Sequence, residues 1–421
     1  MLSASEIEQN RLDLKPRKAE YQQLYEQIRQ KHLSLDITRG KPSSAQLDLA
    51  NALLELPGKH FTVDGTDTRN YGGIDGLPEM KALFAEILGV EASNVIVGGN
   101  SSLNMMYDTL ARACQFGVPD GEKPWNQIEN RKFLCPTPGY DRHFRVTEHL
   151  GFELIAVNLT DHGLDMDQIE SLVSADHAIK GIWCVPKYSN PTGTCYDEDT
   201  VYRLAAMPAA KDFRILWDNA YAEHHLTDNP PHLDNIMTHC IAAGNANRVI
   251  EFASTSKISH PGSGVGALAA SEDNIQDAKG HLGVQTIGPD KVNQLRHLLL
   301  FSDLQGLRTH MQKHAALVKP KFDLVDEVLT RELGGLGIAE WTRPQGGYFV
   351  SLDIPDGLAK QVIGLAADAG VKLTGAGAPF PYGKDPRDRN IRIAPTFPVL
   401  QEVGQATEVL ATCIKLAASG E

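Results

Sequence analysis

Seven short apolar runs recur between about residues 94 and 270, and they restrict the possible fold more than any other feature of the sequence. They are NVIVGG, RKFLC, ELIAVNL, GIWCVP, FRILWDN, RVIEFAS and GALAAS. Runs of this length are typical of buried strands. Several are separated by segments long enough for a helix, such as SSLNMMYDTLARACQ and DEDTVYRLAAMPAA. The alternation predicts a mostly parallel, doubly wound α/β sheet, in which ligands bind outside the carboxyl ends of the strands.

The chain on either side of this region follows other patterns. Near the start, Tyr21, Leu24, Ile28 and Leu33 recur at helical spacing until TRGKPSS breaks the pattern. After about residue 290 come long helical stretches, two strand-like runs, GGYFVSLDI and NIRIAP, and a terminal helix in VLQEVGQATEVLATCIKLA. We therefore predict a large domain over residues 51–300. Residues 1–50, a helix and a loop, join residues 301–421 in a smaller α+β domain.

Charge and cysteine content exclude several classes of function. The chain has 40 Lys and Arg against 53 Asp and Glu, a net charge of −13, which is wrong for a nucleic-acid surface. No stretch approaches the ~18 uninterrupted apolar residues of a membrane helix. The six cysteines form no CxxC, so neither a disulfide framework nor a zinc site is indicated. We expect a cytoplasmic protein that acts on small molecules without a metal ion.

Two apolar strands are followed by residues that could carry chemistry together. Lys257 lies in STSK after the run RVIEFA, and Asp218 follows FRILW with Tyr221 three residues further on. Each alone has an ordinary interpretation, a solvated loop lysine or a turn-forming aspartate. Together they match a pyridoxal phosphate site, in which a lysine amine forms the Schiff base and a carboxylate pairs with the pyridine nitrogen. The charged ring then withdraws electrons from the substrate's α-carbon.

Three further motifs extend this interpretation. Asn190, in SNPTGT, could share with Tyr221 the hydrogen bonds to the cofactor's phenolic oxygen, although Asn-Pro and Thr-Gly also form plain turns. In GGNSSLNMM, Ser101 and Ser102 begin a predicted helix whose N-terminus could bind a phosphate, or could simply be capped. Tyr140, in CPTPGYDRHF, could stack on the pyridine ring or belong to the core.

Taken in order, these motifs resemble the fold-type I pyridoxal phosphate enzymes, specifically the class I/II aminotransferases and most closely the actinobacterial-type aspartate aminotransferases. The likeness covers nearly the whole chain. It is carried by Gly40, Tyr71, Ser101, Tyr140, Asn190 with Pro191 and Gly193, Asp218 with Tyr221, Ser254 to Lys257, and Arg392.

The resemblance implies a role for each matching residue. Lys257 would be the Schiff-base lysine and proton shuttle, assisted by Asp218 and Tyr221, and Arg392 would clamp the substrate's α-carboxylate, with Gly40 and Asn190 beside it. The cofactor phosphate would be bound by Ser101, Ser102 and Ser254. Tyr71 would reach the phosphate of a neighbouring subunit, which implies a homodimer with shared active sites.

Two details remain open in the sequence. Many class I members carry a phosphate-binding arginine eight positions beyond the lysine, where this chain has Val265. Either the helix N-terminus with Ser254, Ser256 and Ser263 suffices, or a group such as His260 substitutes. An acidic substrate also needs a cation for its distal carboxylate, and the candidates are Arg142 and Arg39.

The expected activity is ping-pong transamination between an amino acid, aspartate or glutamate, and a 2-oxo acid, oxaloacetate or 2-oxoglutarate. An aminotransferase for aromatic or branched substrates, a β-lyase or a decarboxylase would share every cofactor residue. A transcription regulator that fuses this fold to a DNA-binding head is a further alternative. About 40 residues precede TRGKP, too few for such a head.

Overall fold

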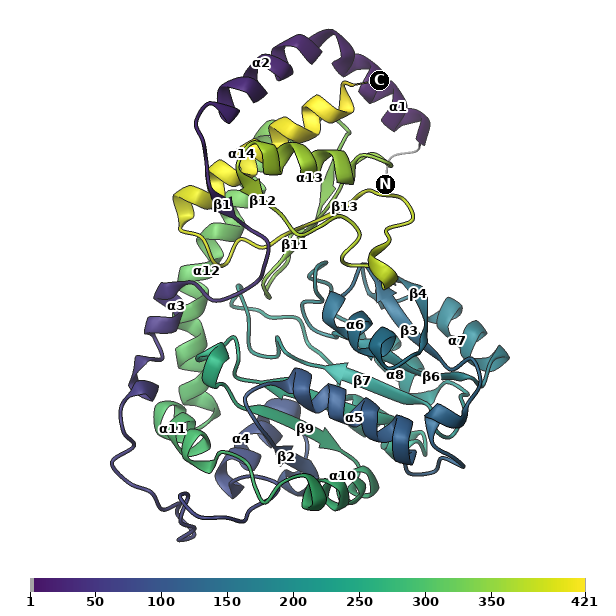
Figure 1. Cartoon of the computed structure of the whole chain (residues 1–421), viewed down its shortest axis with the longest axis vertical. Coiled ribbons are helices and arrows are strands. Elements are labelled where there is room, and N and C mark those ends of the chain that lie inside the picture. The colour runs from purple at the N-terminus through teal and green to yellow at the C-terminus, as the bar shows by residue number, and fades with distance from the viewer. Residues whose placement is uncertain (1–3, 421) are drawn as a thin grey trace.

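An eight-stranded sheet forms the centre of the computed structural model, which describes residues 4–420 (Figure 1). The strands run in the order β2-β9-β8-β7-β6-β3-β4-β5. Their bounds are β2 Val95–Val97, β3 Lys132–Thr137, β4 Glu153–Thr160, β5 Gly163–Leu164, β6 Ile179–Cys184, β7 Arg214–Asp218, β8 Val249–Ser254 and β9 Gly266–Ala270. The middle strands β8, β7, β6, β3 and β4 are parallel, whereas β9 is antiparallel to both neighbours and β5 to β4. The predicted mostly parallel α/β sheet is confirmed.

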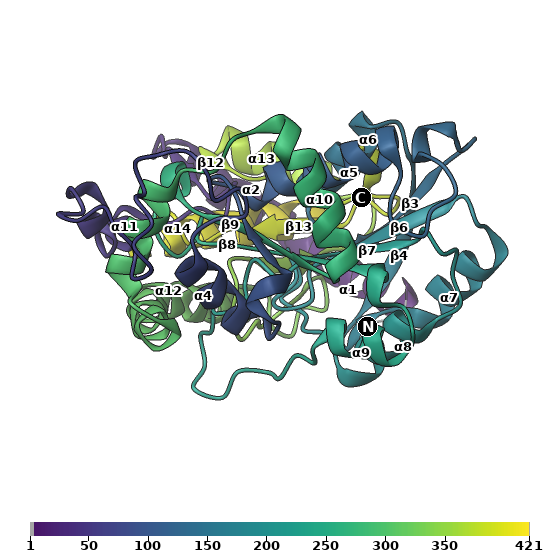
Figure 2. The same ribbon diagram turned by 90° about the horizontal axis from the view of Figure 1, so that it is seen from below.

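Helices cover both faces of this sheet. They are α4 Pro78–Leu88, α5 Ser102–Phe116, α6 Asp141–His149, α7 Met166–Ala175, α8 Glu198–Ala206, α9 Ile236–Ala242, α10 Glu272–Gln285 and α11 Lys291–Phe301. Figure 2 shows α5, α6 and α10 on one side of the sheet and α4, α8 and α9 on the other. Side chains alternate along β7 accordingly. Leu216 packs in the core beneath α5, and Ile215 and Trp217 pack in the core beneath α8 and α9.

A second hydrophobic core joins the two ends of the chain. It contains Tyr21 and Ile28 of α2 together with residues of the last hundred positions. Its elements are α1 Ala4–Leu14, α2 Lys18–Arg29, α13 Ala359–Asp368 and α14 Leu400–Ala418, with the parallel pair β1 Leu35–Asp36 and β12 Val371–Lys372, and the antiparallel sheet of β10 Glu340–Trp341, β11 Val350–Asp353 and β13 Asn390–Ile393. This arrangement agrees with a smaller α+β unit built from both ends.

One long helix passes from the first core to the second. Helix α12, Leu304–Leu333, contributes Leu307 and Met311 to the core beside the central sheet and Val318 onward to the other core (Figure 1). Because α12 belongs to both, the predicted boundary at residue 300 stays a prediction. The short helix α3, Ser44–Asp48, lies beside α12. In the described part of the chain, no helix is both long and apolar enough to cross a membrane.

Candidate active site

The predicted lysine and aspartate follow adjacent parallel strands of the central sheet. Strand β7 ends at Asp218, and β8 ends three residues before Lys257. The Lys257 Nζ atom lies 5.0 Å from the centre of the Tyr221 ring and 5.9 Å from that of Tyr348. Burial lowers the pKa of Lys257, and the nearby Asp218 carboxylate only partly opposes this effect. The amine is therefore neutral, and able to act as a nucleophile or base, at a lower pH than an exposed lysine.

The Asp218 carboxyl group uses one oxygen and leaves the other free. Its Oδ2 atom is 2.9 Å from Nε2 of His143, a residue only 1% exposed. The His143 ring stacks on Trp183, with 4.2 Å between ring centres and 6° between ring planes. The buried Oδ1 atom of Asp218 has no hydrogen-bond partner among the described residues. Since buried polar atoms are nearly always partnered, Oδ1 is placed to receive an N–H from a bound molecule.

Two phenol side chains, Tyr140 and Tyr221, border the same place. Tyr140 precedes α6, and its ring meets the ring of His143 edge-on at 4.8 Å. Burial, with the charges of Asp218 and Asp141, raises the pKa of Tyr140 to about 12. Burial also raises the pKa of Tyr221 well above its usual value. Both phenols therefore keep their protons at neutral pH and can donate hydrogen bonds.

Arg392 enters the site from β13, in the other core. Its Nη1 donates to Asp141 Oδ1 at 2.9 Å and to Asn190 Oδ1 at 3.4 Å. Its guanidinium carbon lies 5.0 Å from the centre of the Phe349 ring, and its buried Nε has no partner within residues 4–420. A side chain at Gly40 would run into that Phe349 ring. The structure thus brings Arg392, Asn190 and Gly40 together around Phe349.

The predicted phosphate-binding serines lie at the start of α5. Ser101 Oγ accepts a hydrogen bond from the Leu103 N–H at 3.2 Å, which is the capping role that the sequence left open. Ser254 is paired in register with Gly266, where an added Cβ would lie 2.9 Å from the Ser101 carbonyl carbon and 3.0 Å from the Ser102 nitrogen. Ser254 is therefore next to this helix N-terminus, whose free N–H groups favour an anion.

The candidates for replacing the absent arginine differ in position. Ser256 Oγ is close to this helix start, 3.4 Å from the Asn100 carbonyl. His260 Nε2 lies 3.0 Å from the Leu47 carbonyl, so its ring is bound to the end of α3 rather than to the start of α5. Val265 is buried, and its N–H donates to Thr255. The geometry favours the serines over His260 as the groups that bind the phosphate in place of the absent arginine.

The remaining predicted residues are exposed. Tyr71 is 82% exposed, in a loop that Lys291 holds through a 2.8 Å hydrogen bond to the Asn70 carbonyl. Arg142 and Arg39 are also exposed. Arg142 is near enough to Tyr140 for its charge to favour the ionised phenol, against the larger effect of burial. The charge of Arg142 thus acts on Tyr140, whereas Arg39 adjoins Gly40, on the side of Phe349 and Arg392.

His143 and Asp141 were missed by the sequence analysis. Both stand at the start of α6, next to Tyr140, and His143 is three residues beyond that tyrosine, on a neighbouring helix position. A buried histidine in PGYDRHF had no distinctive pattern. The only available signal was its position beside a residue that had already been assigned to the site.

Fold-type I pyridoxal phosphate enzymes are the class of proteins that this sheet and this set of side chains define. The residues present fit the cofactor, because Asp218 Oδ1 lacks a partner where a pyridine N–H would donate, and Lys257 faces the same place. A family model for aspartate amino-transferase matches residues 10–421. The chain belongs to the aspartate aminotransferase family, whose members use pyridoxal phosphate.

Relatives at high identity agree with this assignment. An aspartate aminotransferase of Corynebacterium glutamicum is 48% identical over 398 residues, which are 94% of this chain and 92% of that protein. The crystal structure of an aspartate transaminase from the same species is 46% identical, with a TM-score of 0.93, over 99% of this chain and 97% of that one. The crystal structure of an α-aminoadipate aminotransferase from Thermus thermophilus shares the fold, with a TM-score of 0.74 and 20% identity. The match covers 91% of this chain and 92% of that one.

Proposed function

We propose that the protein is an aspartate aminotransferase, which exchanges the amino group of aspartate or glutamate for the oxo group of 2-oxoglutarate or oxaloacetate. The observation that carries this proposal is the unpartnered, buried Asp218 Oδ1 beside the amine of Lys257. Pyridoxal phosphate, when bound, supplies the electron sink that stabilises negative charge at the substrate's α-carbon. The names of the close relatives support the choice of substrate.

Each residue then has one task. Asp218 is held by His143 so that Oδ1 accepts the pyridine N–H, and Tyr221 and Asn190 donate to the cofactor's phenolic oxygen. Lys257 Nζ removes the proton from the α-carbon of the amino acid, and its lowered pKa favours the neutral form that this task requires. The α5 N-terminus, with Ser101, Ser102, Ser254 and Ser256, binds the phosphate.

Arg392 would bind the α-carboxylate of the substrate. In the structure its Nη1 is held by Asp141 and Asn190, which fixes the orientation of the planar guanidinium before substrate arrives. The buried and unpartnered Nε remains available. We assign the distal carboxylate to Arg142, because it is the candidate close to Tyr140.

A donor panel with purified protein tests the activity. Aspartate and glutamate should convert the bound cofactor to its amine form, and 2-oxoglutarate or oxaloacetate should restore it, with ping-pong kinetics. If aromatic or branched amino acids convert the cofactor faster than aspartate does, they are the preferred donors and the proposed substrate is wrong. Release of pyruvate would instead identify a lyase, and release of carbon dioxide a decarboxylase. Borohydride reduction followed by peptide mass spectrometry should locate the cofactor on Lys257, and Lys257→Ala should nearly abolish turnover.

We further propose a homodimer in which Tyr71 of one subunit contributes to the phosphate site of the other. The high exposure of Tyr71 supports this role, since nothing in its own subunit covers it. Mixing the inactive variants Tyr71→Ala and Lys257→Ala should restore part of the activity, because half of each hybrid's sites would be intact. No recovery on mixing, with exchange of subunits verified, would contradict shared sites. A cytoplasmic location stays a prediction, and the six free cysteine thiols accord with it.

A further inference from the structure

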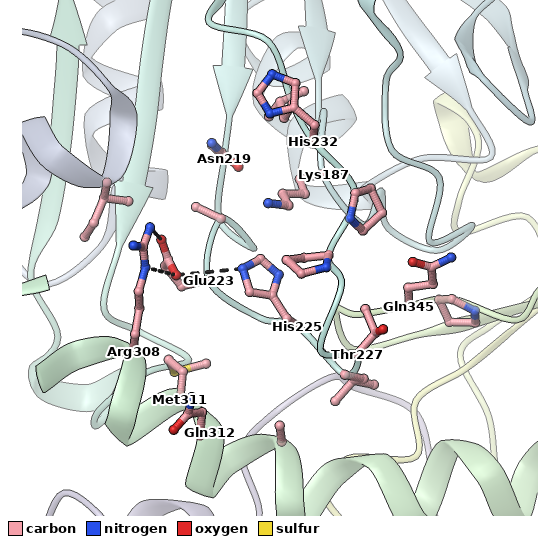
Figure 3. Close-up of a pocket in the computed structure, with 18 of the residues that line it drawn as sticks. Lys187, Asn219, Glu223, His225, Thr227, His232, Arg308, Met311, Gln312 and Gln345 are labelled. Carbon is pink, nitrogen blue, oxygen red and sulfur yellow. Dashed lines mark hydrogen bonds and ion pairs between the residues drawn. The ribbon is translucent and has the colours of Figure 1, made fainter. Parts of the chain in front are cut away.

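A cavity of about 1370 Å³, shown in Figure 3, lies beside strands β7 and β8 of the central sheet. Its walls come from the end of α4, the middle of α12 and the loop of residues 226–235. Neither Lys257, Asp218, Tyr221 nor Arg392 lines it. The cavity is therefore separate from the site described above.

The lining of this cavity on the side of the sheet, its floor, comes from Trp217 of β7, Asn219 just after β7, and Glu251 of β8. Trp217 and Glu251 are partners in the parallel register, and with Asn219 they point away from the face that carries Asp218. Glu251 is 3% exposed and Asn219 is 8% exposed. Glu251 Oε1 and Asn219 Oδ1 both lack a hydrogen-bond partner among the described residues. Two neighbouring, buried acceptors without donors are unusual, and they call for a ligand that brings N–H groups.

The wall of the cavity carries a lysine that forms no ion pair with the described residues. Lys187, which follows β6, points into the space (Figure 3). The nearby Glu223 carboxylate, whose charge partly opposes the effect of burial on the Lys187 pKa, is paired with Arg308, which donates to both of its oxygens at 3.0 Å. His225 is likewise engaged, 2.8 Å from the Tyr188 hydroxyl and 3.7 Å from Glu223. No carboxylate within residues 4–420 forms an ion pair with Lys187, and burial lowers its pKa.

We propose that this cavity binds a zwitterionic amino acid, whose ammonium group donates to Asn219 and to Glu251, which releases its carboxyl proton to solvent on binding, and whose carboxylate accepts from Lys187. A simple amine would leave Lys187 without a counterion, and a simple carboxylate would leave the two acceptors unsatisfied. Only a ligand with both an ammonium group and a carboxylate can donate to Glu251 and Asn219 and also accept from Lys187. The remaining volume, beside Met311 and Gln312 of α12, would receive the ligand's own side chain.

Tryptophan positions allow the two sites to be observed separately. The chain has four tryptophans, of which Trp217 lines the cavity and Trp183 stacks on His143 behind Asp218. The holoenzyme labelled with 5-fluorotryptophan should therefore give one fluorine resonance for each site, assigned with Trp→Phe variants. Each proteinogenic amino acid is titrated in turn, with methylammonium and acetate as single-charge probes.

At least one amino acid should shift the Trp217 resonance saturably, at concentrations that differ from those that shift the Trp183 resonance. The variants Glu251→Gln and Lys187→Met should each weaken that binding about tenfold or more, the effect of one lost charged hydrogen bond. Lys319→Met is the matched control, because Lys319 also borders the cavity but is already paired with Asp323 at 2.7 Å. The Lys319→Met variant should bind the amino acid as tightly as the wild type does.

Three results would overturn the proposal. The first is that no amino acid shifts the Trp217 resonance of the wild-type holoenzyme. The second is that the binding midpoint is the same in wild type, Glu251→Gln and Lys187→Met. The third is that methylammonium or acetate binds as well as the best amino acid, which would remove the need for a ligand with both charges. The titration is made on the wild-type holoenzyme, with Trp→Phe variants needed only to assign its resonances, and none of these results bears on the transamination proposal.

Discussion

Glu251 should make the stability of this protein depend strongly on pH. Burial alone raises the pKa of Glu251 to about 8 in the folded state, against 4.5 in a solvated chain. Between these values the folded chain keeps a proton that the unfolded chain releases, so stability falls as pH rises from about 4.5 to about 8. At about 1.36 kcal/mol per pKa unit, a difference of about 3.5 units amounts to at most about 5 kcal/mol. Glu251→Gln has nearly the same shape and no titrating proton, so it should lack this loss.

The assay compares the free energy of unfolding of Glu251→Gln and wild type at several pH values. The difference between them should grow in favour of the variant by roughly 3–5 kcal/mol from pH 4.5 to pH 8 and then stay constant. Contributions from other groups cancel in this comparison. Glu55→Gln, at an exposed position, is the control and should show no such trend. A flat difference for Glu251→Gln across this range would refute the argument that the carboxyl group is buried without a partner.

Three further predictions concern the cofactor site. His143→Phe keeps an aromatic ring on Trp183 but removes the donor to Asp218, so a spectroscopic titration of the apoenzyme should show pyridoxal phosphate binding weakened roughly 10- to 100-fold, and His143→Gln should recover part of it. Arg142→Ala should raise KM for aspartate and glutamate about tenfold and leave a neutral donor's KM nearly unchanged, and equal losses would remove Arg142 from this role. The rate at which the apoenzyme captures pyridoxal phosphate should rise with pH and level off below about pH 10.4, the value for free lysine, because burial lowers the pKa of Lys257. A rise that continues to that pH would contradict the burial argument.

Local patterns were enough to predict the central sheet and to select candidate site residues, whose roles stay predictions. Each of the seven apolar runs overlaps one strand of the sheet, in order β2, β3, β4, β6, β7, β8 and β9. Asp218 and Lys257 could be placed at one edge because residues after adjacent parallel strands meet there. The antiparallel direction of β9 was not foreseen, since a strand's apolar sequence does not show which way it runs.

Contacts between distant segments could not be predicted in the same way. β1 and β12 are two-residue strands that pair across more than 300 positions, and so short a strand has no periodicity to detect. The ion pair of Arg392 with Asp141 joins two cores, and neither residue's neighbours indicate the other. Glu251 is recognisable in the sequence as a charged residue inside the apolar run RVIEFAS. Burial of such a residue is costly without a partner, and in the structure its Oε1 atom has none among the described residues.

Helix α12 also contains Pro320, close to the point where the helix passes from one core to the other. Proline has no N–H, so the carbonyl four residues earlier loses its usual bond, and the helix is least stiff at that turn. Arg392 lies on β13, in the core that α12 enters after that turn, and Lys257 follows β8 of the central sheet, beside the core that α12 leaves. A change in the bend of α12 at Pro320 would therefore shift the core that carries Arg392 relative to the sheet that carries Lys257, and would change the spacing between the two side chains.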